Sequence, residues 1–240
     1  MKIFLAGAGG VIGRRLTPLL RKAGHDVAGT TRSADKAPAL RALGAEPVVV
    51  DVFDADALSR AVKAAAPQVI IHQLTDLPFA PNTPRYNEGL ERNSRLRVDG
   101  TRTLAAAAKA AGVRRLIAQS IAFVYAPGEG ARRESDPLDL AATDMRKGTV
   151  DGVVALEQAT LELPEGIVLR YGFLYGSGTW FEDEKRAKPG LHVDAAAQAA
   201  LLAVTKGTRG IYNIAEDDGA ISSEKAKRDF GFDASFRISG

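Results

Sequence analysis

The chain has 240 residues, of which 45% are hydrophobic and 25% are charged, with a formal net charge of +3. This composition is typical of an ordinary globular protein with a large core, in one domain or one domain with a small appendage. The absence of cysteine excludes disulfides, thiolate nucleophiles and cysteine-based metal sites. A charge of +3 does not indicate nucleic-acid binding, since basic residues come only in short pairs. The three histidines lie far apart and show no metal-ligand spacing, so we expect no metal.

The chain opens with an apolar run, FLAGAGGVIGRRL at residues 4–16, that glycines interrupt. A secretory signal would need a longer apolar centre, and Arg14 and Arg15 stand where a mature secreted chain would start. No segment approaches the ~18 uninterrupted apolar residues of a membrane span. We therefore expect a cytoplasmic protein with no membrane partner.

Short apolar runs alternate with longer helical patterns along the chain. The runs are mostly uninterrupted, as in parallel strands that are covered on both faces. The predicted strands are residues 2–6, 26–30, 47–50, 69–72, 115–119, 167–171 and 210–214. The predicted helices are residues 11–23, 35–43, 55–65, 98–111, 149–161 and 222–230.

This alternation predicts an α/β fold with a right-handed, doubly wound parallel sheet, a Rossmann fold. Residues 77–97 and 126–147 break it with prolines, glycines and charges. Both follow predicted strands, at the carboxyl edge where open α/β sheets place their ligands. We expect residues 1–165 to form the dinucleotide-binding part. Residues 166–240 then complete the same compact unit with the rest of the sheet and a small substrate lobe.

The glycines after the first strand predict a dinucleotide site. Gly7 makes the tight turn, Gly10 lets a diphosphate approach the backbone, and Gly13 lets the following helix lie close to the sheet. The helix start offers unpaired N–H groups and the positive end of its dipole to the phosphates. A strand before the glycines, a helix after them and a second strand about 20 residues on strengthen this prediction.

The end of the second strand indicates which cofactor is bound. Enzymes that prefer NAD(H) usually place Asp or Glu there, on the ribose hydroxyls. Here the sequence is GTTRS, in which Arg32 would attract a 2′-phosphate, with Thr31 and Ser33 as hydrogen-bond donors. We therefore expect NADP(H) to be preferred over NAD(H), although Arg32 is also compatible with an ordinary surface arginine. Asp51 is placed to accept from the adenine amine. The full set expected around the dinucleotide is Gly7, Gly10, Val11, Ile12, Gly13, Thr31, Arg32, Ser33, Asp51, Val52, Gln73, Leu74, Thr75, Ser120 and Tyr171.

Several longer segments resemble the extended short-chain dehydrogenases, and in particular the bacterial NAD-dependent epimerase/dehydratase family. They are GAGGVIG, VVVDVFDADAL, VIIHQLTDLP, VDGTRTLAAAAKAAGVRRLIAQS, VLRYGFLYGSGT and HVDAAAQAALLAV. The similarity covers nearly the whole chain. It implies a nicotinamide cofactor and a carbonyl, alcohol or nucleotide-sugar substrate. It also implies that the segments at 169–176 and 192–194 carry the substrate side.

The chain departs from this family at its acid–base pair. The family uses a tyrosine four residues before a lysine to exchange a proton with the substrate. Alignment on Glu157 places Thr149 and Val153 at those two positions, and no Tyr-x-x-x-Lys occurs anywhere in the 240 residues. We name Ser120 and Tyr125 as candidate catalytic residues in its place, although a tyrosine at the position of Tyr125 is more often simply a packed loop aromatic. Two alternatives stay open: a substrate group or water supplies the proton, or the cofactor is bound but not turned over.

The space between the sixth strand and residues 192–194 holds only SGTWFEDEKRAKPG, residues 177–190. This leaves little room for a nucleotide-sugar and favours a smaller, apolar small-molecule substrate. The aromatic residues expected around it are Phe79, Tyr125, Phe173, Tyr175 and Trp180. Lys185, Arg186 and Lys188 are candidates to hold an anion, but a solvated charged loop explains them as well.

The sequence thus predicts an NADP-dependent oxidoreductase of short-chain type, acting on a small carbonyl compound or alcohol. Three alternatives remain: a dinucleotide-sensing regulator without turnover, a nucleotide-sugar epimerase or dehydratase, and a redox-neutral isomerase or cyclase. A homodimer that pairs through helices 98–111 and 149–161 is a further expectation from the family resemblance.

Overall fold

The fold is built on a parallel β-sheet. The computed structural model describes residues 1–77, 85–182 and 187–238, and within these ranges the main sheet has seven strands in the order β3-β2-β1-β4-β5-β6-β9, with every neighbouring pair parallel. The strands are β1 (Lys2–Ala6), β2 (Asp26–Thr31), β3 (Glu46–Val49), β4 (Val69–His72), β5 (Arg115–Ile121), β6 (Ile167–Tyr171) and β9 (Gly210–Ile214). The order reverses between β1 and β4, so the carboxyl ends of these two strands form the crevice where such sheets bind ligands. The predicted fold class is confirmed.

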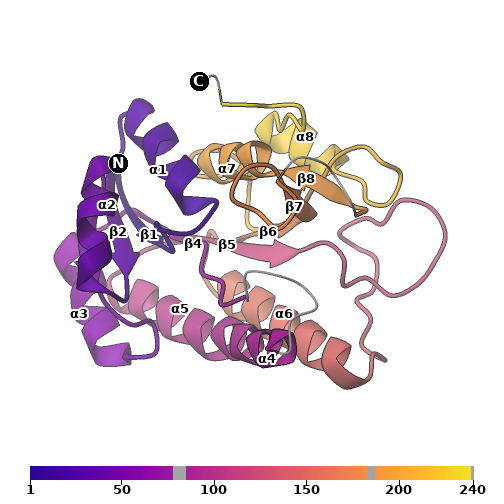
Figure 1. The fold of residues 1–240 in the computed structure, drawn as a ribbon, viewed down its shortest axis with the longest axis horizontal. Coiled ribbons are helices and arrows are strands. Elements are labelled where there is room, and N and C mark those ends of the chain that lie inside the picture. Colours follow the sequence, from indigo (N-terminus) through magenta and orange to yellow (C-terminus); the bar gives the residue numbers. More distant parts are fainter. Residues whose placement is uncertain (78–84, 183–186, 239–240) are drawn as a thin grey trace.

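Helices cover both faces of this sheet (Figure 1). On one face, α1 (Gly13–Lys22) packs with α7 (Val193–Leu202), and on the other lie α3 (Ala55–Ala65), α4 (Tyr86–Arg95), α5 (Thr101–Ala110) and α6 (Asp144–Leu161). Successive side chains of a strand pack against the helices on opposite faces of the sheet. In β1, Ile3 and Leu5 belong to one core cluster, and Phe4 and Ala6 belong to the other. Both layers are apolar, which is why strands such as β1 and β4 are mostly hydrophobic. The remaining described helices are η1 (Ala34–Lys36), α2 (Ala37–Ala42), η2 (Leu96–Gly100) and α8 (Glu224–Phe230).

The structure corrects the predicted elements after the fourth strand. The stretch 77–97, predicted to be irregular, contains α4, which continues through the π-helical turn η2 into α5. The sequence hides α4 because the residues it buries, Gly89 and Asn93, are not hydrophobic, so no apolar stripe marks the helix. The fifth strand is also longer than predicted, so Ser120 lies within β5 and not after it.

A small second layer stands beside β6 on the substrate side. It consists of a two-stranded parallel sheet, β7 (Phe173–Tyr175) with β8 (Gly190–His192), and β8 leads directly into α7. Gly172 joins β6 to β7 where the backbone of Pro189 passes; a Cβ there would lie 2.7 Å from the Pro189 carbonyl oxygen. Across the described ranges, the helices all lack the length and apolar character needed to cross a bilayer.

Candidate functional site

Two glycines of the first turn are required by the fold itself. Gly7, directly after β1, has φ +94° and donates its N–H to Thr30 Oγ1 at 3.2 Å. A Cβ at Gly7 would lie 2.6 Å from the carbonyl oxygen of Gln73, and one at Gly13 would lie 2.2 Å from the carbonyl oxygen of Gly7. Neither position has room for a side chain. At this turn, the backbones of β1, the residue after β4 and the start of α1 therefore pack in close contact.

Gly10 has a different surrounding. It is exposed, and a Cβ there would have a single near neighbour, the Gly7 carbonyl oxygen at 3.3 Å. Helix α1 then begins at Gly13 with Ile12 as its N-cap, and no side chain caps this end. A bare backbone next to an uncapped helix N-terminus is the arrangement that accepts a diphosphate. The predicted residues Val11 and Ile12 lie within this turn, between Gly10 and α1.

Gln73 adds a buried acceptor beside the turn. Its Oε1 is buried and has no hydrogen-bond partner among the described residues, while its Nε2 donates to Tyr171 Oη at 3.4 Å. The Tyr171 hydroxyl donates in turn to the Ala196 carbonyl on α7 at 3.2 Å, and burial raises its pKa. An unpaired buried acceptor is costly in a closed fold and fits a site whose donor comes from a ligand. Next to it, Leu74 is half-buried and Thr75 is exposed.

The three residues predicted to select the cofactor lie at the carboxyl end of β2. The side chain of Arg32 is exposed, and no described residue forms an ion pair with it. Ser33 Oγ donates to the Asp35 carboxylate and thereby lowers the pKa of Asp35. Thr31 Oγ1 donates to the Ser33 carbonyl and accepts from Ser33 N, both at 3.2 Å. Both hydroxyls thus have internal partners, and the free donor group at this position is the guanidinium.

The next predicted contacts follow β3. The exposed carboxylate of Asp51 accepts from Phe53 N at 3.0 Å. The side chain of Val52 is buried, and its carbonyl accepts from Thr103 Oγ1 at 2.6 Å. β3 and β2 are neighbours in the sheet, so Asp51 and Arg32 follow adjacent strand ends.

The two candidate catalytic residues lie in a buried polar network. Ser120 Oγ donates to Glu157 Oε1 at 2.8 Å, and the same carboxylate accepts from Arg170 Nε at 2.8 Å and Arg170 Nη2 at 2.6 Å. Arg170 Nη1 donates to the hydroxyl of Tyr125 at 2.7 Å, and that hydroxyl donates to Asn213 Oδ1 at 2.6 Å. Ser120, Arg170 and Asn213 are each no more than 3% exposed. The predicted proton donors therefore face partners inside the protein.

The electrostatics of this network oppose proton exchange. Burial raises the pKa of Tyr125, although hydrogen bonds from Arg170 and to Asn213 partly offset the rise. Burial by itself would lower the pKa of Arg170, but the hydrogen bonds and charge of Glu157 outweigh it and raise that pKa. The guanidinium stays charged and the phenol stays protonated at neutral pH. Ser120 and Tyr125 thus form hydrogen bonds at the two ends of a buried Glu157–Arg170 ion pair.

The positions that the family resemblance assigns to the acid–base pair lie on α6. Thr149 Oγ1 donates to the Met145 carbonyl of the preceding turn at 3.4 Å, and Val153 is fully buried in a cluster with Ile121, Val124 and Val150. Helix α6 thus carries a threonine and a valine at the two positions where the family places a titrating pair.

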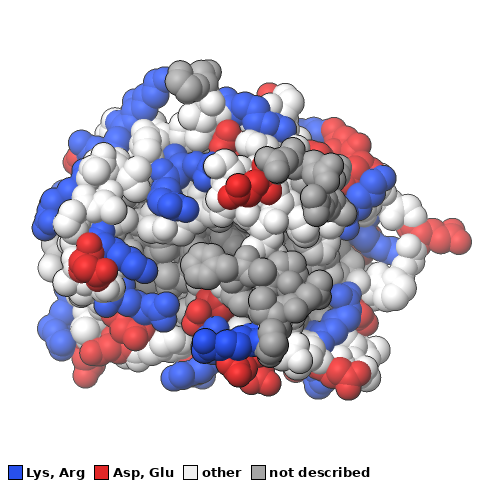
Figure 2. All heavy atoms as spheres, viewed as in Figure 1, with Lys and Arg blue, Asp and Glu red and all other residues white. Residues whose placement is uncertain are grey.

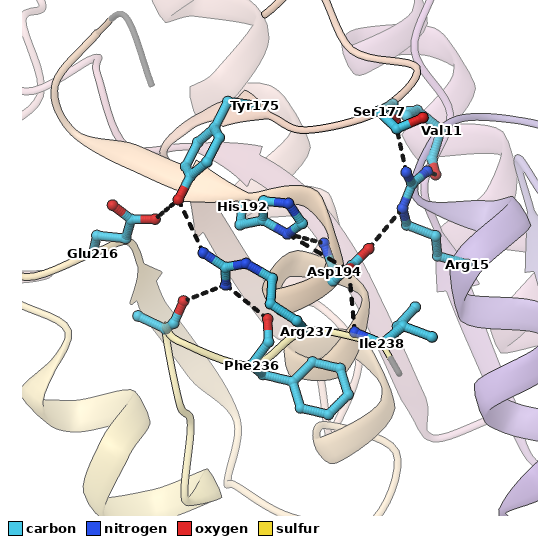
Figure 3. Close-up of polar contacts among 11 residues, drawn as sticks. Val11, Arg15, Tyr175, Ser177, His192, Asp194, Glu216, Phe236, Arg237 and Ile238 are labelled. Atoms are coloured by element: carbon cyan, nitrogen blue, oxygen red, sulfur yellow. Dashed lines mark hydrogen bonds and ion pairs between the residues drawn. The ribbon is translucent and has the colours of Figure 1, made fainter. Parts of the chain in front are cut away.

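A second polar cluster ties the substrate-side segments to α1 (Figure 3). Arg15 donates from Nε to Asp194 Oδ1 at 2.8 Å and from Nη2 to the Ser177 carbonyl at 2.6 Å. Asp194 Oδ2 accepts from Ile238 N at 3.1 Å, which fixes the C-terminal segment to the start of α7. Arg15 follows the glycine turn by two residues. Arg15 therefore joins α1 to the helix after β8 by an ion pair and to the loop after β7 by a hydrogen bond.

Tyr175 and His192 stand on the other side of this cluster (Figure 3). The Tyr175 hydroxyl donates to Glu216 Oε1 at 2.5 Å and accepts from Arg237 Nη2 at 3.0 Å. The Tyr175 ring meets the His192 ring edge-on at 5.1 Å between centroids. Burial, with the charge of Arg237, lowers the pKa of His192. These contacts fix β7 and β8 against the C-terminal segment.

Two aromatic pairs belong to the predicted substrate side. Phe123, after β5, stacks on Phe173 at 3.9 Å between centroids, and Tyr86, at the start of α4, meets Trp180 at 6.2 Å. Trp180 remains 37% exposed. Phe79, Lys185 and Arg186 lie outside the described residues; Lys188 Nζ donates to the Asp218 carbonyl at 3.3 Å.

The surface in Figure 2 carries interspersed basic and acidic side chains over the face shown. Among residues 1–77, 85–182 and 187–238, no three His, Asp or Glu side chains are grouped to hold a metal ion.

The sequence prediction did not name Arg170 or the Arg15–Asp194 pair, and it used Glu157 only to align the family's acid–base pair. One signal was visible: Arg170 interrupts the apolar run IVLRY, and a charge in a strand covered on both faces needs a buried partner. Arg97 lies in a polar stretch and gave no comparable signal.

Comparison with known proteins agrees with this geometry. A family model described as NAD(P)H-binding matches residues 7–155. A Streptomyces sp. protein named 3-diazoavenalumate denitrifying reductase is 39% identical over 93% of this chain and 79% of its own length. An uncharacterized protein of Schizosaccharomyces pombe is 25% identical over 98% of this chain and 88% of its own length.

Solved structures of the same fold include UDP-glucose 4-epimerases. The enzyme of Thermotoga maritima, solved with UDP-glucose, superposes with a TM-score of 0.79 at 16% identity, covering 99% of this chain and 94% of that one. The enzyme of Thermus thermophilus, solved with NAD, gives a TM-score of 0.77 at 17% identity, with 99% and 95% covered. At these identities the likeness is one of fold. The family model and the Streptomyces reductase carry the assignment, and the chain is a member of the NAD(P)H-binding family of Rossmann-fold proteins.

Proposed function

We propose that this protein is an NADPH-dependent reductase whose substrate accepts a hydride without a proton from the protein. The observation that carries this proposal is the combination of an open glycine turn at residues 7–13 with Thr149 and Val153 on α6 at the positions of the family's titrating pair. The turn suits a dinucleotide. An α6 without a titrating pair does not suit an alcohol or a carbonyl, whose oxygen must exchange a proton.

The residues that would hold the dinucleotide follow from the fit of the turn. Gly10 and the N-terminus of α1 would bind the diphosphate, and Asp51 would accept a hydrogen bond from the adenine amine. Gln73 Oε1 would accept a hydrogen bond from a donor on the nicotinamide half. Arg32 would pair with a 2′-phosphate, because it is exposed and has no ion-pair partner among the described residues. When bound, NADPH supplies the hydride.

The preference for NADP(H) is tested at Arg32. Arg32→Asp should weaken NADP⁺ binding by at least tenfold relative to NAD⁺ binding in calorimetry, because the carboxylate repels the 2′-phosphate. Arg41→Asp, an equally large charge change at another exposed arginine, is the matched control and should affect both dinucleotides alike. If Arg32→Asp lost the same affinity for NADP⁺ as for NAD⁺, the assignment of NADP(H) as the preferred cofactor would be wrong.

The substrate class that best fits a site without an acid–base pair is an aryl diazo compound. An arenediazonium ion accepts a hydride and leaves as the arene and N₂, so atoms and charge balance without any added proton. The name of the Streptomyces relative supports this class, since a 3-diazoavenalumate denitrifying reductase is 39% identical over 93% of the chain. The aromatic pairs Phe123–Phe173 and Tyr86–Trp180 suit a flat aryl ring.

The experiment is a labelled reduction. Protein, NADPH carrying deuterium on the transferring carbon, and a benzenediazonium bearing a carboxylate are incubated, and the arene is analysed by mass spectrometry. We expect deuterium at the carbon that lost N₂, with one N₂ released for each NADPH consumed. A panel of ketones, aldehydes and quinones tests the small-carbonyl substrate expected from the sequence.

Three outcomes contradict the proposal. Deuterium taken from solvent instead of NADPH would exclude hydride transfer to this carbon. If NADPH were consumed with carbonyl compounds and not with the diazonium ion, the protein would be a carbonyl reductase. Tight dinucleotide binding with no consumption by either class would favour a dinucleotide-sensing regulator.

A further inference from the structure

A buried arginine stands apart from the network described above. Arg97 lies in η2, the wide π-helical turn between α4 and α5, and is only 9% exposed. Its guanidinium forms no ion pair or hydrogen bond with a described residue. Single π turns inside α-helices occur frequently at functional sites. A guanidinium with five donors and no acceptor needs an explanation at this depth.

The charges around Arg97 do not balance. It interacts electrostatically with His72 on β4 and Glu157 on α6. Burial and the charge of Arg97 lower the pKa of His72 to about 4, so this imidazole is neutral at pH 7. Glu157 already accepts two hydrogen bonds from Arg170 and one from Ser120. Two guanidiniums and one carboxylate thus share the interior, which leaves one positive charge in excess.

Arg97 keeps its charge despite burial. Burial lowers its pKa to about 10, and the attraction of Glu157 opposes this fall. At neutral pH the side chain is therefore a cation. Arg97 is 9% exposed and has no ion-pair partner among the described residues, so a carboxylate that arrives with a ligand is the partner that its planar guanidinium suits best.

The position of Arg97 indicates which ligand that is. Helix α6 approaches η2 at Gly152, where a Cβ would lie 3.5 Å from Arg97 Cβ and 3.4 Å from Ser94 Cα. Gly152 lies between Thr149 and Val153, the two positions that correspond to the family's acid–base pair. The diphosphate turn lies on α1, which covers the opposite face of the sheet. Arg97 is therefore next to the positions where the family places its acid–base pair, on the other face of the sheet from the glycine turn.

We propose that Arg97 binds a carboxylate of the substrate and so selects anionic aryl substrates. The proposal rests on the proposed function for the position of the substrate. A planar guanidinium pairs with a carboxylate through two parallel hydrogen bonds, which fixes both its position and its orientation. The same pair neutralises the excess charge of the interior.

The experiment compares a charged probe with a neutral isostere. Cinnamate and cinnamide are titrated calorimetrically into the protein with and without NADP⁺, for wild type, Arg97→Gln, Arg97→Lys and Arg102→Gln. Arg102 is the matched control, since it lies on α5 five residues on, with its side chain 71% exposed. We expect Arg97→Gln to weaken cinnamate about 10- to 100-fold, Arg97→Lys to weaken it less, and Arg102→Gln to have no effect. Cinnamide and NADP⁺ should bind all four proteins alike.

A thermal measurement separates a binding role from a structural one. If the guanidinium of Arg97 serves the ligand and not the fold, Arg97→Gln unfolds at a midpoint no lower than wild type, and cinnamate raises the midpoint of wild type and Arg102→Gln but not that of Arg97→Gln. A marked loss of stability in ligand-free Arg97→Gln would show that the guanidinium serves the fold, and would overturn the proposal.

The remaining outcomes of the titrations distinguish failure of the carboxylate site from failure of the proposed function. Cinnamate binding that does not exceed cinnamide binding, or that is unchanged in Arg97→Gln, overturns the assignment. If Arg97→Gln lost affinity for NADP⁺ alone, Arg97 would bind a phosphate of the cofactor, and the assignment to a substrate carboxylate would be wrong. Cinnamate binding that depends on Arg97 in a protein that binds no dinucleotide would keep the carboxylate site and refute the proposed function instead.

Discussion

Glu157 is the position where the structure makes its sharpest stability prediction. Glu157→Gln keeps the shape of the side chain but removes the single negative charge that faces Arg170, and the pair is buried, with side-chain exposures of 3% and 6%. Breaking a buried ion pair by neutralising one partner costs about 3–5 kcal/mol, because the remaining charge stays buried without compensation. The charge of Arg97 lies in the same interior and adds to this cost.

The loss is measured by urea unfolding, followed by circular dichroism. We expect a fall in the free energy of unfolding of about 3–5 kcal/mol with an unchanged m-value, equivalent to roughly 6–20 °C in Tm for a chain of this size. Glu162→Gln is the matched control on the same chain, since its exposed pair with Lys109 should contribute no more than about 1 kcal/mol. Equal losses in the two variants would refute the view that the Ser120–Glu157–Arg170–Tyr125 network is a buried structural unit.

Two further predictions concern His72 and Asp194. The folded-state pKa of His72 is about 4, below its ordinary value of 6.5, so the unfolded chain takes up this proton first as the pH falls, and about 3 kcal/mol of stability is lost between these two values. His72→Gln should flatten that part of the pH–stability profile measured by denaturant unfolding; a profile as steep as that of wild type would contradict the assignment. Asp194→Ala removes the acceptor of both Arg15 and Ile238 N, so we expect a loss of about 1–3 kcal/mol and faster proteolytic removal of the last residues, followed by mass spectrometry. An unchanged cleavage rate would mean that other contacts hold the C-terminal segment.

The sheet and most helices could be predicted from the sequence because their signals are local. β4 and β6 are short runs of buried residues, and the caps at Gly24, Gly44 and Gly112 all adopt positive φ. Helix α4 could not be predicted, because it buries Gly89 and Asn93 instead of an apolar stripe.

The candidate site divides in the same way. The glycine turn is local, and its geometry follows from residues 7–13 and the strand before them. The roles of Ser120 and Tyr125 could not be predicted, because their partners Glu157, Arg170 and Asn213 come from three distant elements. Arg97 escaped notice for the same reason: its lack of a counter-ion is a property of the folded interior.

Calorimetric titration of Gly10→Val and wild type with NADPH and NADH tests the central claim most directly. A Cβ at Gly10 would lie 3.3 Å from the Gly7 carbonyl oxygen, a tight contact with the backbone, so urea unfolding first establishes that the variant is folded; its side chain then blocks the diphosphate. The account predicts that wild type binds NADPH more tightly than NADH and that folded Gly10→Val binds neither. Undiminished NADPH affinity in Gly10→Val would place the dinucleotide elsewhere and contradict the account.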